Sequence, residues 1–357
     1  MSEENIPLEN ENEHRSSLDP NHSTDDRQED NPSEKETLRI DPSIMEIANA
    51  YDRLRGEMRK VIIGQDNLME ELFITLLCDG HALIEGVPGI AKTMTAKLFA
   101  RILNVDFSRI QFTPDLMPAD VLGTNVFNMK ESSFEFKEGP IFSNVVLIDE
   151  INRAPAKTQS SLFEVMEERQ ITIDGQRRRM EGPFLVLATQ NPVEQEGTYK
   201  LPEAQLDRFF FRIMVDYPSL EEEMQILSRF KEDFTQKVQE EVIPVIDRTD
   251  LETFRKTVER VRISDDLIKY IAQLIHTTRQ SPDLFLGASP RASLAIMKAA
   301  KAYATLQGRE FVTPDDIKRV VYPVLNHRLL LSPEREMEGV TLREILDAQI
   351  QTIEIPR

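Results

Sequence analysis

The sequence predicts an α/β fold in which a five-stranded, mostly parallel sheet lies between helices and is followed by a C-terminal domain of helices. Short apolar runs alternate with amphipathic stretches between Tyr51 and Tyr217, which is typical of buried parallel strands joined by helices. Beyond Pro218 the apolar spacing becomes helical, and the first 40 residues show neither pattern. We therefore expect a disordered acidic tail at 1–40, an αβα domain at 41–217 and a helical domain at 218–357.

The five expected strands are short runs rich in Val, Ile, Leu and Phe, and such runs are typical of strands buried on both faces. They occupy 81–85, 107–112, 145–148, 184–188 and 209–215. In the C-terminal domain, Ser264, Ser289 and Thr313 are each followed by Asp or Pro. This pattern is a helix start signal, so a helix is expected after each of the three.

Composition limits the class of protein. The 357 residues carry 62 acidic and 43 basic side chains, a net charge of -19. An acidic surface does not favour nucleic acid or anionic lipid, so neither is expected as a partner. The single cysteine, Cys78, excludes a metal site built from several thiolates and fits a reducing compartment,. Since no apolar run is long enough for direct membrane insertion, we expect a cytoplasmic protein.

A glycine-rich loop follows the first expected strand and opens a helix at Lys92. Small residues let successive backbone N–H groups approach a phosphate, Lys92 can reach its oxygens, and the Thr93 hydroxyl can bind Mg²⁺ at the start of the helix. Ala91 stands where glycine is usual, so a plain turn before a helix is the alternative. The order of strand, loop and helix favours phosphate binding by Gly86, Val87, Pro88, Gly89, Ile90, Ala91, Lys92, Thr93 and Met94.

Two carboxylates, Asp149 and Glu150, end the apolar strand at 145–148. Neighbouring side chains on a strand point to opposite sides. One acid can therefore reach a metal ion while the other faces an attacking water. We assign the metal to Asp149 and the water to Glu150. The alternative, a helix cap at Asp149, is disfavoured by the loop at Lys92.

Three further polar residues stand at the ends of expected elements. Asn191 follows the strand at 184–188, where an amide can position water, although Asn-Pro is usually a turn,. Arg208 precedes the last strand, and a lone exposed arginine is its alternative reading,. Arg291 lies in the first turn of a helix, where a cation opposes the helix dipole, so we expect it to have an anionic partner such as a phosphate,.

These five motifs, in this order, resemble the AAA+ ATPases, and the match is closest to the MoxR family. The segments that carry the closer resemblance are 111–123, 149–155, 188–192 and 196–209. The resemblance covers about residues 45 to 335. It implies Walker A at 86–93, Walker B at 145–150, sensor 1 at Asn191, an arginine finger at Arg208 and sensor 2 at Arg291. The fold implied is an AAA+ domain with a helical lid, and Ile63 and Gly64 would border the adenine.

The resemblance also implies an activity and its partners. ATP and Mg²⁺ would be the cofactors, and the catalytic residues would be Glu150, Asn191, Arg208 and Arg291. Arg291 would contact the γ-phosphate from its own lid, whereas Arg208 would enter from the next subunit of a ring, expected to be a hexamer. MoxR relatives resemble chaperones that remodel client proteins with a von Willebrand factor A domain partner. The alternatives are a motor subunit of a magnesium-chelatase-like complex and a nucleotide-gated scaffold with little hydrolysis.

Two hairpins are expected in addition to the main strands. Residues 126–136 form two short strands about a polar turn, with Phe134 and Phe136 on one face,. Residues 170–179 alternate up to an Asp-Gly turn and end in the basic run 177–179,. Their positions resemble the helix-2 insert and the pre-sensor-1 hairpin of related ATPases. The basic run could contact an acidic partner or simply be solvated, and its sequence favours neither reading.

Overall fold

The computed structural model describes residues 41–191, 199, 201–231 and 241–354. The expected acidic tail at 1–40 lies outside the described residues. None of the helices in these ranges is long and apolar enough to cross a membrane.

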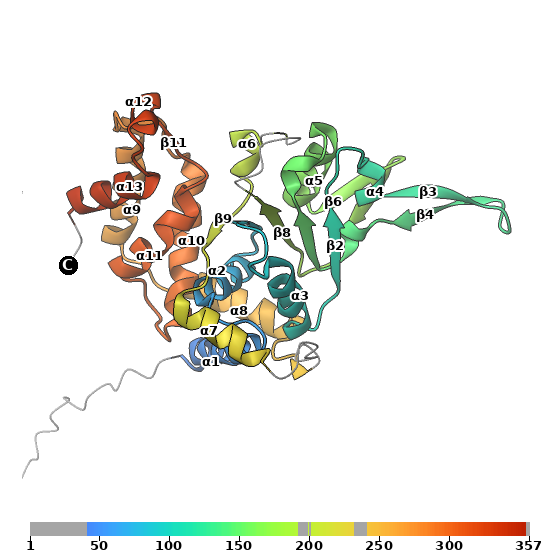
Figure 1. Cartoon of the computed structure of the whole chain (residues 1–357), viewed down its shortest axis with the longest axis horizontal. Helices are drawn as coiled ribbons and strands as arrows, with labels where there is room; N and C mark the ends of the chain where they lie inside the picture. The colour runs from blue at the N-terminus through green and yellow to red at the C-terminus, as the bar shows by residue number, and fades with distance from the viewer. Residues whose placement is uncertain (1–40, 192–198, 200, 232–240, 355–357) are drawn as a thin grey trace, which may run out of the picture. The chain divides into compact units, whose positions relative to one another are not determined.

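The central sheet has five parallel strands in the order β2–β5–β8–β1–β9. Figure 1 shows it between α3 on one face and α5 on the other. All five expected strands are confirmed, with ends that differ by no more than two residues. Their bounds are β1 Ala82–Gly86, β2 Phe107–Gln111, β5 Val145–Asp149, β8 Leu185–Gln190 and β9 Phe211–Val215.

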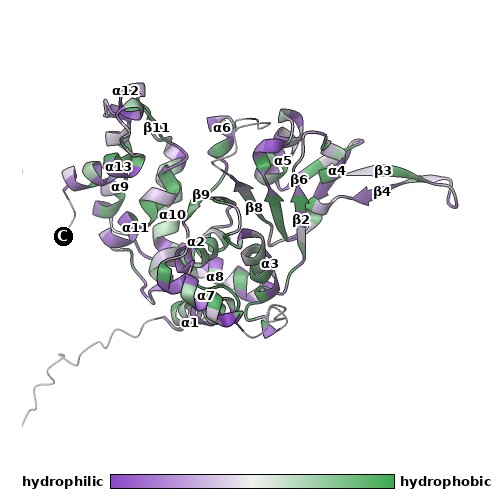
Figure 2. Cartoon of the chain, in the orientation of Figure 1, coloured by the Kyte–Doolittle hydropathy of each residue, from purple (hydrophilic) through white to green (hydrophobic). Residues whose placement is uncertain are grey.

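Alternate residues of the central strands enter two different cores. On β5, Val145 and Leu147 belong to one buried cluster, whereas Val146 and Ile148 belong to the other. This follows from the two-residue period of a strand, and it explains why the runs are apolar throughout. Figure 2 shows these strands as hydrophobic and the outward faces of the surrounding helices as largely hydrophilic.

One of these cores is continuous with the C-terminal helices. It is covered by α1 Pro42–Arg59, α2 Asp66–Leu77 and α3 Lys92–Ile102, and it extends into α8 Arg248–Arg260 and the lid. The other core lies under α5 Ala156–Glu168, with α4 Pro118–Leu122 beside it. The remaining short helices are α6 Glu203–Leu206, α7 Leu220–Arg229 and the single 3-10 turns at Pro140–Phe142 and Ile151–Arg153.

The C-terminal part is helical, as expected. Its helices are α9 Asp265–Gln280, α10 Pro290–Leu306, α11 Pro314–Leu325, α12 Pro333–Met337 and α13 Leu342–Thr352. Helices begin after each of the expected start residues, and the side chain of Ser264 accepts a hydrogen bond from the backbone N–H of Leu267. The structure adds one antiparallel pair, β10 Leu284–Leu286 with β11 Leu330–Leu331, which was not expected.

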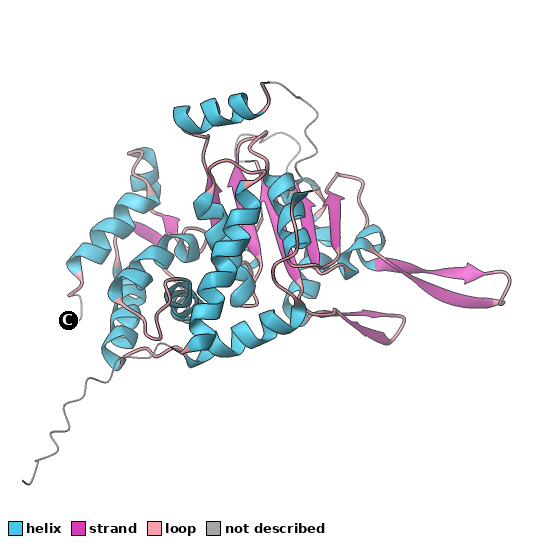
Figure 3. Ribbon diagram, turned by 90° about the horizontal axis from the view of Figure 1, so that it is seen from below, coloured by secondary structure: helices cyan, strands magenta, loops and turns pink. Residues whose placement is uncertain are grey.

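Both expected hairpins are confirmed. The first pairs β3 Gly123–Asn128 with β4 Ser133–Glu138, and the second pairs β6 Gln170–Ile173 with β7 Gln176–Arg179. Figure 3 shows them extending from the same side of the molecule. They also touch: the Arg178 guanidinium lies 4.0 Å from the centre of the Phe136 ring, and the Asn125 amide donates to Asp174. One member of the basic run 177–179 is therefore directed at the other hairpin.

Candidate functional site

A cavity of about 1320 Å³ opens at the carboxyl edge of the central sheet. The segment before α2, the loop before α3 and the ends of β5, β8 and β9 form its walls. A parallel sheet places the ends of all its strands at this edge, so motifs far apart in sequence meet there. Of the expected residues, those that border the cavity are Ile63, Pro88, Gly89, Ile90, Ala91, Lys92, Thr93, Met94, Asp149, Glu150 and Asn191.

Three other expected residues, Gly64, Gly86 and Val87, are not among the described residues that line the cavity. A Cβ on Gly86 would lie 2.5 Å from the Ile90 side chain and 2.6 Å from the Val215 carbonyl. The position therefore requires glycine, because the end of β9 passes directly against it.

The loop itself curls around the Lys92 ammonium. Lys92 donates to the carbonyls of Gly86 and Val87, the second at 3.2 Å. Burial lowers the pKa of this ammonium, and the nearby carboxylates, Asp149 foremost, oppose that shift. An arriving phosphate would give the cation a stronger partner than the two carbonyls.

Ala91 adopts the left-handed conformation, with φ 59°. This conformation explains why glycine is usual at the position, since an alanine there carries a strain of about 1 kcal/mol. Gly89 is also left-handed, at φ 88°, and a Cβ there would meet nothing within 4 Å. The backbone around the loop is thus open toward the cavity at Gly89, where a phosphate could approach it closely.

The two carboxylates at the end of β5, Asp149 within the strand and Glu150 just after it, already have partners. Arg109 Nε lies 2.6 Å from Oδ2 of Asp149, and the Thr189 hydroxyl donates to Oδ1 at 3.1 Å. Glu150, left-handed at φ 56°, accepts from the Gln111 amide at 2.8 Å. Asp149 is buried, whereas the Glu150 side chain is 33% exposed, which suits a group that must meet a water.

Arg109 and Gln111 are site residues that the sequence reasoning missed. They are two residues apart on β2 and therefore share a face. Gln111 lies directly opposite Asp149 in the β2–β5 register. The signal was the alternation of Arg109 and Gln111 with the apolar Ile110 and Phe112, but its meaning depends on β2 being the neighbour of β5.

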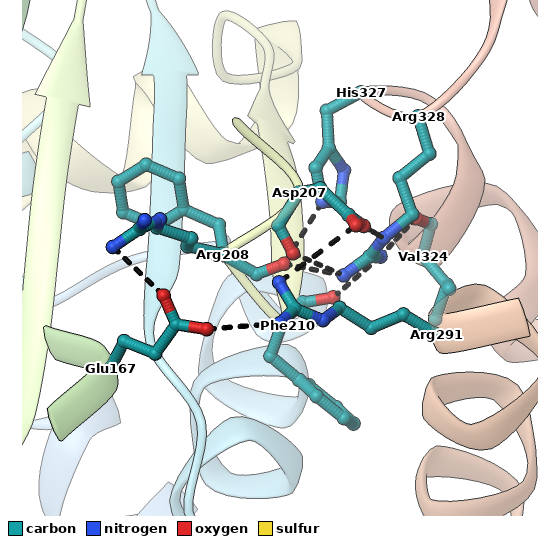
Figure 4. Close-up of polar contacts among 9 residues, drawn as sticks. Glu167, Asp207, Arg208, Phe210, Arg291, Val324, His327 and Arg328 are labelled. Atoms are coloured by element: carbon teal, nitrogen blue, oxygen red, sulfur yellow. Dashed lines mark hydrogen bonds and ion pairs between the residues drawn. The ribbon is translucent and has the colours of Figure 1, made fainter. Parts of the chain in front are cut away.

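Arg208 and Arg291 do not border the cavity; they lie together on Glu167, as Figure 4 shows. Arg208 Nη1 is 2.9 Å from one oxygen of Glu167, and Arg291 Nη2 is 3.1 Å from the other. Arg208 also donates to the Phe163 carbonyl at 2.6 Å. The expected anionic partner of Arg291 is therefore Glu167 in this structure.

These two arginines lie at the opposite edge of the sheet from the loop. Arg208 comes just before β9 begins at Phe211, whereas the cavity borders the residues where β9 ends. A strand of five residues spans about 16 Å,. Arg291 thus does not reach the cavity of its own chain, which differs from the expected contact between the lid and the chain's own γ-phosphate.

Known proteins resemble the chain across both domains. Residues 81–211 match the ATPase family associated with various cellular activities (AAA), and residues 276–349 match the AAA lid domain. The chaperone MoxR1 of Mycobacterium tuberculosis is 41% identical over 318 residues, 87% of this chain and 83% of that protein. The protein MoxR of Paracoccus denitrificans is 30% identical over 342 residues, 89% of this chain and 99% of that protein.

A solved structure also resembles this one. The crystal structure of a putative ATPase from Cytophaga hutchinsonii superimposes with a TM-score of 0.82 at 41% identity, covering 88% of this chain and 98% of that one. The superposition of the fold, the match to the AAA lid domain and the sequence identities all agree with the motifs that the sequence places at the two edges of the sheet. The chain therefore belongs to the MoxR family of AAA+ ATPases.

Proposed function

We propose that the chain binds ATP with Mg²⁺ in the cavity at the carboxyl edge and hydrolyses it within a ring of identical subunits, a hexamer by analogy with its relatives. One observation carries the proposal: the loop residues 88–93, the first turn of α3 and the two carboxylates at the end of β5 border the same cavity. Backbone N–H groups at a helix start and a lysine ammonium favour a polyphosphate at this point.

An adenine fits the wall formed by the segment before α2. The Gln65 amide nitrogen donates to the Ile90 carbonyl at 2.7 Å, while its buried Oε1 accepts no hydrogen bond from any residue that the structure describes. A buried acceptor in this state is costly. The exocyclic amino group of adenine would satisfy it, with Ile63 and Gly64 alongside.

The donor set also fits Mg²⁺. Thr93 and Asp149 border the cavity together and offer a hydroxyl and a carboxylate, the oxygen ligands that this ion prefers,. When bound, the ion would neutralise charge on the β- and γ-phosphates. Lys92 would pair with the same oxygens. Glu150 would take a proton from the attacking water, and the Asn191 amide would hold that water in line.

Arg208 and Arg291 would act on the nucleotide of the neighbouring subunit. Their position at the edge opposite the loop supports this arrangement. Two cations at the γ-phosphate stabilise the charge of the transition state, and a single arginine of this kind contributes on the order of 10³ to 10⁵ in rate. Hydrolysis would therefore require assembly.

The relative named as a chaperone supports a role in remodelling client proteins. We propose that ATP turnover drives this remodelling, with a partner that carries a von Willebrand factor A domain. The single cysteine, Cys78, suits a reducing compartment,, so we place the activity in the cytoplasm.

Glu150→Gln tests the proposed chemistry. The variant should bind ATP as tightly as the wild type, because the phosphate contacts remain, and lose turnover on the order of 10²-fold to 10⁴-fold. Phosphate release and binding of a fluorescent ATP analogue measure the two properties. Glu164→Gln, the same change on the exposed side of α5, is the control. Wild-type turnover in Glu150→Gln would remove Glu150 from the mechanism.

Arg208→Ala tests the shared site. Nucleotide binding to the isolated chain should stay unchanged, whereas turnover should fall on the order of 10³-fold, because the neighbour loses its arginine. Mixing Arg208→Ala with Glu150→Gln should restore part of the activity, since some interfaces then combine an intact Glu150 with an intact Arg208. Full turnover by Arg208→Ala alone would show that the arginine does not act between subunits.

A further inference from the structure

We propose that Glu167 is a positioning residue that holds Arg208 and Arg291 together as one cationic pair. On assembly, the phosphate of a neighbouring subunit's nucleotide displaces the Glu167 carboxylate from both arginines. This inference rests on the proposed function, since the phosphate is taken to come from another copy of the chain.

Glu167 contacts both arginines, whereas Asp207, whose Oδ2 lies 3.9 Å from Nη1 of Arg291, is a second and more distant anion. Arg208 lies between α6 and β9, Arg291 lies in the first turn of α10, and Glu167 lies at the end of α5. Each oxygen of Glu167 receives one guanidinium, at 2.9 Å and 3.1 Å. Figure 4 shows the carboxylate reaching both arginines. The lid and the sheet domain thus meet at the Glu167 carboxylate.

The two arginines can exchange the Glu167 carboxylate for another anion. The side chain of Glu167 is 42% exposed and that of Arg291 is 51% exposed. Ion pairs in contact with water contribute little net stability, because solvent screens them and side-chain freedom is lost. Arginine and phosphate form stronger, often bidentate, charge-assisted hydrogen bonds. A phosphate brought to this edge would therefore displace the carboxylate.

Arg328, in the same cluster, is a buried arginine whose hydrogen-bond partners all lie within the chain. Its side chain is 3% exposed, and its Nε lies 2.6 Å from Asp207. It also donates to the carbonyls of Phe209 and Phe210, at 2.6 Å and 3.2 Å. These contacts leave Arg328 no route to an external phosphate. Only Arg208 and Arg291, of the three arginines drawn in Figure 4, are placed to exchange partners.

In the free subunit, before assembly, the negative charge of Glu167 stabilises two neighbouring cations. Arg291 opposes the dipole of α10 and lies near a second cation, so both arginines gain from an anion between them. A neutral side chain at 167 would leave the two cations to repel each other in the free subunit. It would also remove a competitor for the phosphate. Both effects favour the assembled state, so the variant should assemble more readily.

Glu167→Gln tests this with a change of charge and almost none of shape. The protein concentration for half-maximal assembly in ATPγS, measured by sedimentation velocity, should fall about threefold to tenfold, the size expected for one or two exposed ion pairs. Glu168→Gln, the same change at the adjacent exposed position, should leave it unchanged. Glu167→Asp keeps the charge and should return the value toward that of the wild type.

A double variant separates exchange from a structural role. In the Arg208→Ala background the effect of Glu167→Gln should shrink, because one of the competing ion pairs no longer exists. Assembly by Glu167→Gln at an unchanged or higher concentration would overturn the proposal. If Arg208→Ala loses turnover while Glu167→Gln has no effect, the shared site survives and only the role of Glu167 is lost. If Arg208→Ala keeps full turnover, the shared site itself fails.

Discussion

Arg109 Nε lies 2.6 Å from Oδ2 of Asp149, so a guanidinium holds the carboxylate that the proposed metal ion would need. The contact joins β2 to β5, two neighbouring strands of the sheet. Asp149 is 10% exposed at its side chain, whereas Arg109 is 52% exposed and free to swing outward. We infer that Arg109 competes with Mg²⁺ for this carboxylate in the nucleotide-free chain.

Arg109→Gln should therefore raise the affinity of the nucleotide-free chain for Mn²⁺, used as a visible substitute for Mg²⁺. The expected change is about tenfold, because a charge-assisted hydrogen bond is worth roughly 1.4 kcal/mol or more. Electron paramagnetic resonance of free Mn²⁺ measures it. Arg260→Gln, an exposed change at the end of α8, is the control, and Asp149→Asn should cancel the gain. An unchanged Mn²⁺ affinity would show that Arg109 does not compete.

Lys92→Ala should weaken the binding of both ATP and ADP. The ammonium is partly buried within the loop, and its contact with phosphate is a charge-assisted one, worth about 1.5 to 3 kcal/mol or roughly 10-fold to 100-fold in affinity,. Titration with a fluorescent nucleotide measures the loss. Lys256→Ala, on the exposed side of α8, should bind normally. Equal affinities for Lys92→Ala and the wild type would move the phosphate away from this loop.

The strands could be predicted from the sequence because each is short and rich in apolar residues, and β1, β5 and β8 are buried on both faces. The phosphate loop could be predicted because its parts are consecutive. The partners of Asp149 could not, since Arg109 reaches it only across the β2–β5 pairing, and strand order is not a local property. Strands as short as β10 and β11 leave too few residues for any period to be read.

Arg291 is a second residue whose partner could not be identified from the sequence. Its place in the first turn of a helix indicated an anionic partner, and this prediction is confirmed. The identity of the partner depends on how the lid meets the sheet domain, which brings residue 291 beside residue 167. No spacing in the sequence reports that contact.

Arg328→Met should destabilise the fold. The change leaves the Asp207 carboxylate without its closest cation and removes the hydrogen bonds that Arg328 donates to four backbone carbonyls. Breaking a buried pair costs about 3 to 5 kcal/mol, and we expect about 2 to 4 kcal/mol because Asp207 is a quarter exposed,. Urea unfolding measures it. Arg335→Met, which breaks the exposed pair with Asp283, should change stability little. Similar stability for the two variants would contradict a structural role for Arg328.

His81 should make the fold sensitive to acid. The ring is buried, with Nδ1 accepting from the Val186 N–H at 3.0 Å and Nε2 3.1 Å from the Met166 carbonyl. Burial lowers the pKa of His81 to about 3, whereas an unfolded histidine titrates near 6.5. The folded state therefore resists protonation. The contribution of neutral His81 to the free energy of unfolding is fully present above about pH 6.5. It is lost as the pH falls toward 3, by up to about 1.4 kcal/mol per pH unit.

Glu71 acts in the opposite direction and must be separated from His81. Burial raises the pKa of Glu71 to about 7, so its contribution is fully present below the unfolded value and is lost as the pH rises through 7,. Both His81→Gln and the wild type contain Glu71, so the difference in stability between them removes the pH-dependent contribution of Glu71. The stability advantage of the wild type should shrink as the pH falls from 7.5 to 5, whereas His276→Gln, exposed on α9, should track the wild type. An advantage that stays constant over this range would show that His81 is protonated as easily in the folded chain as in the unfolded one.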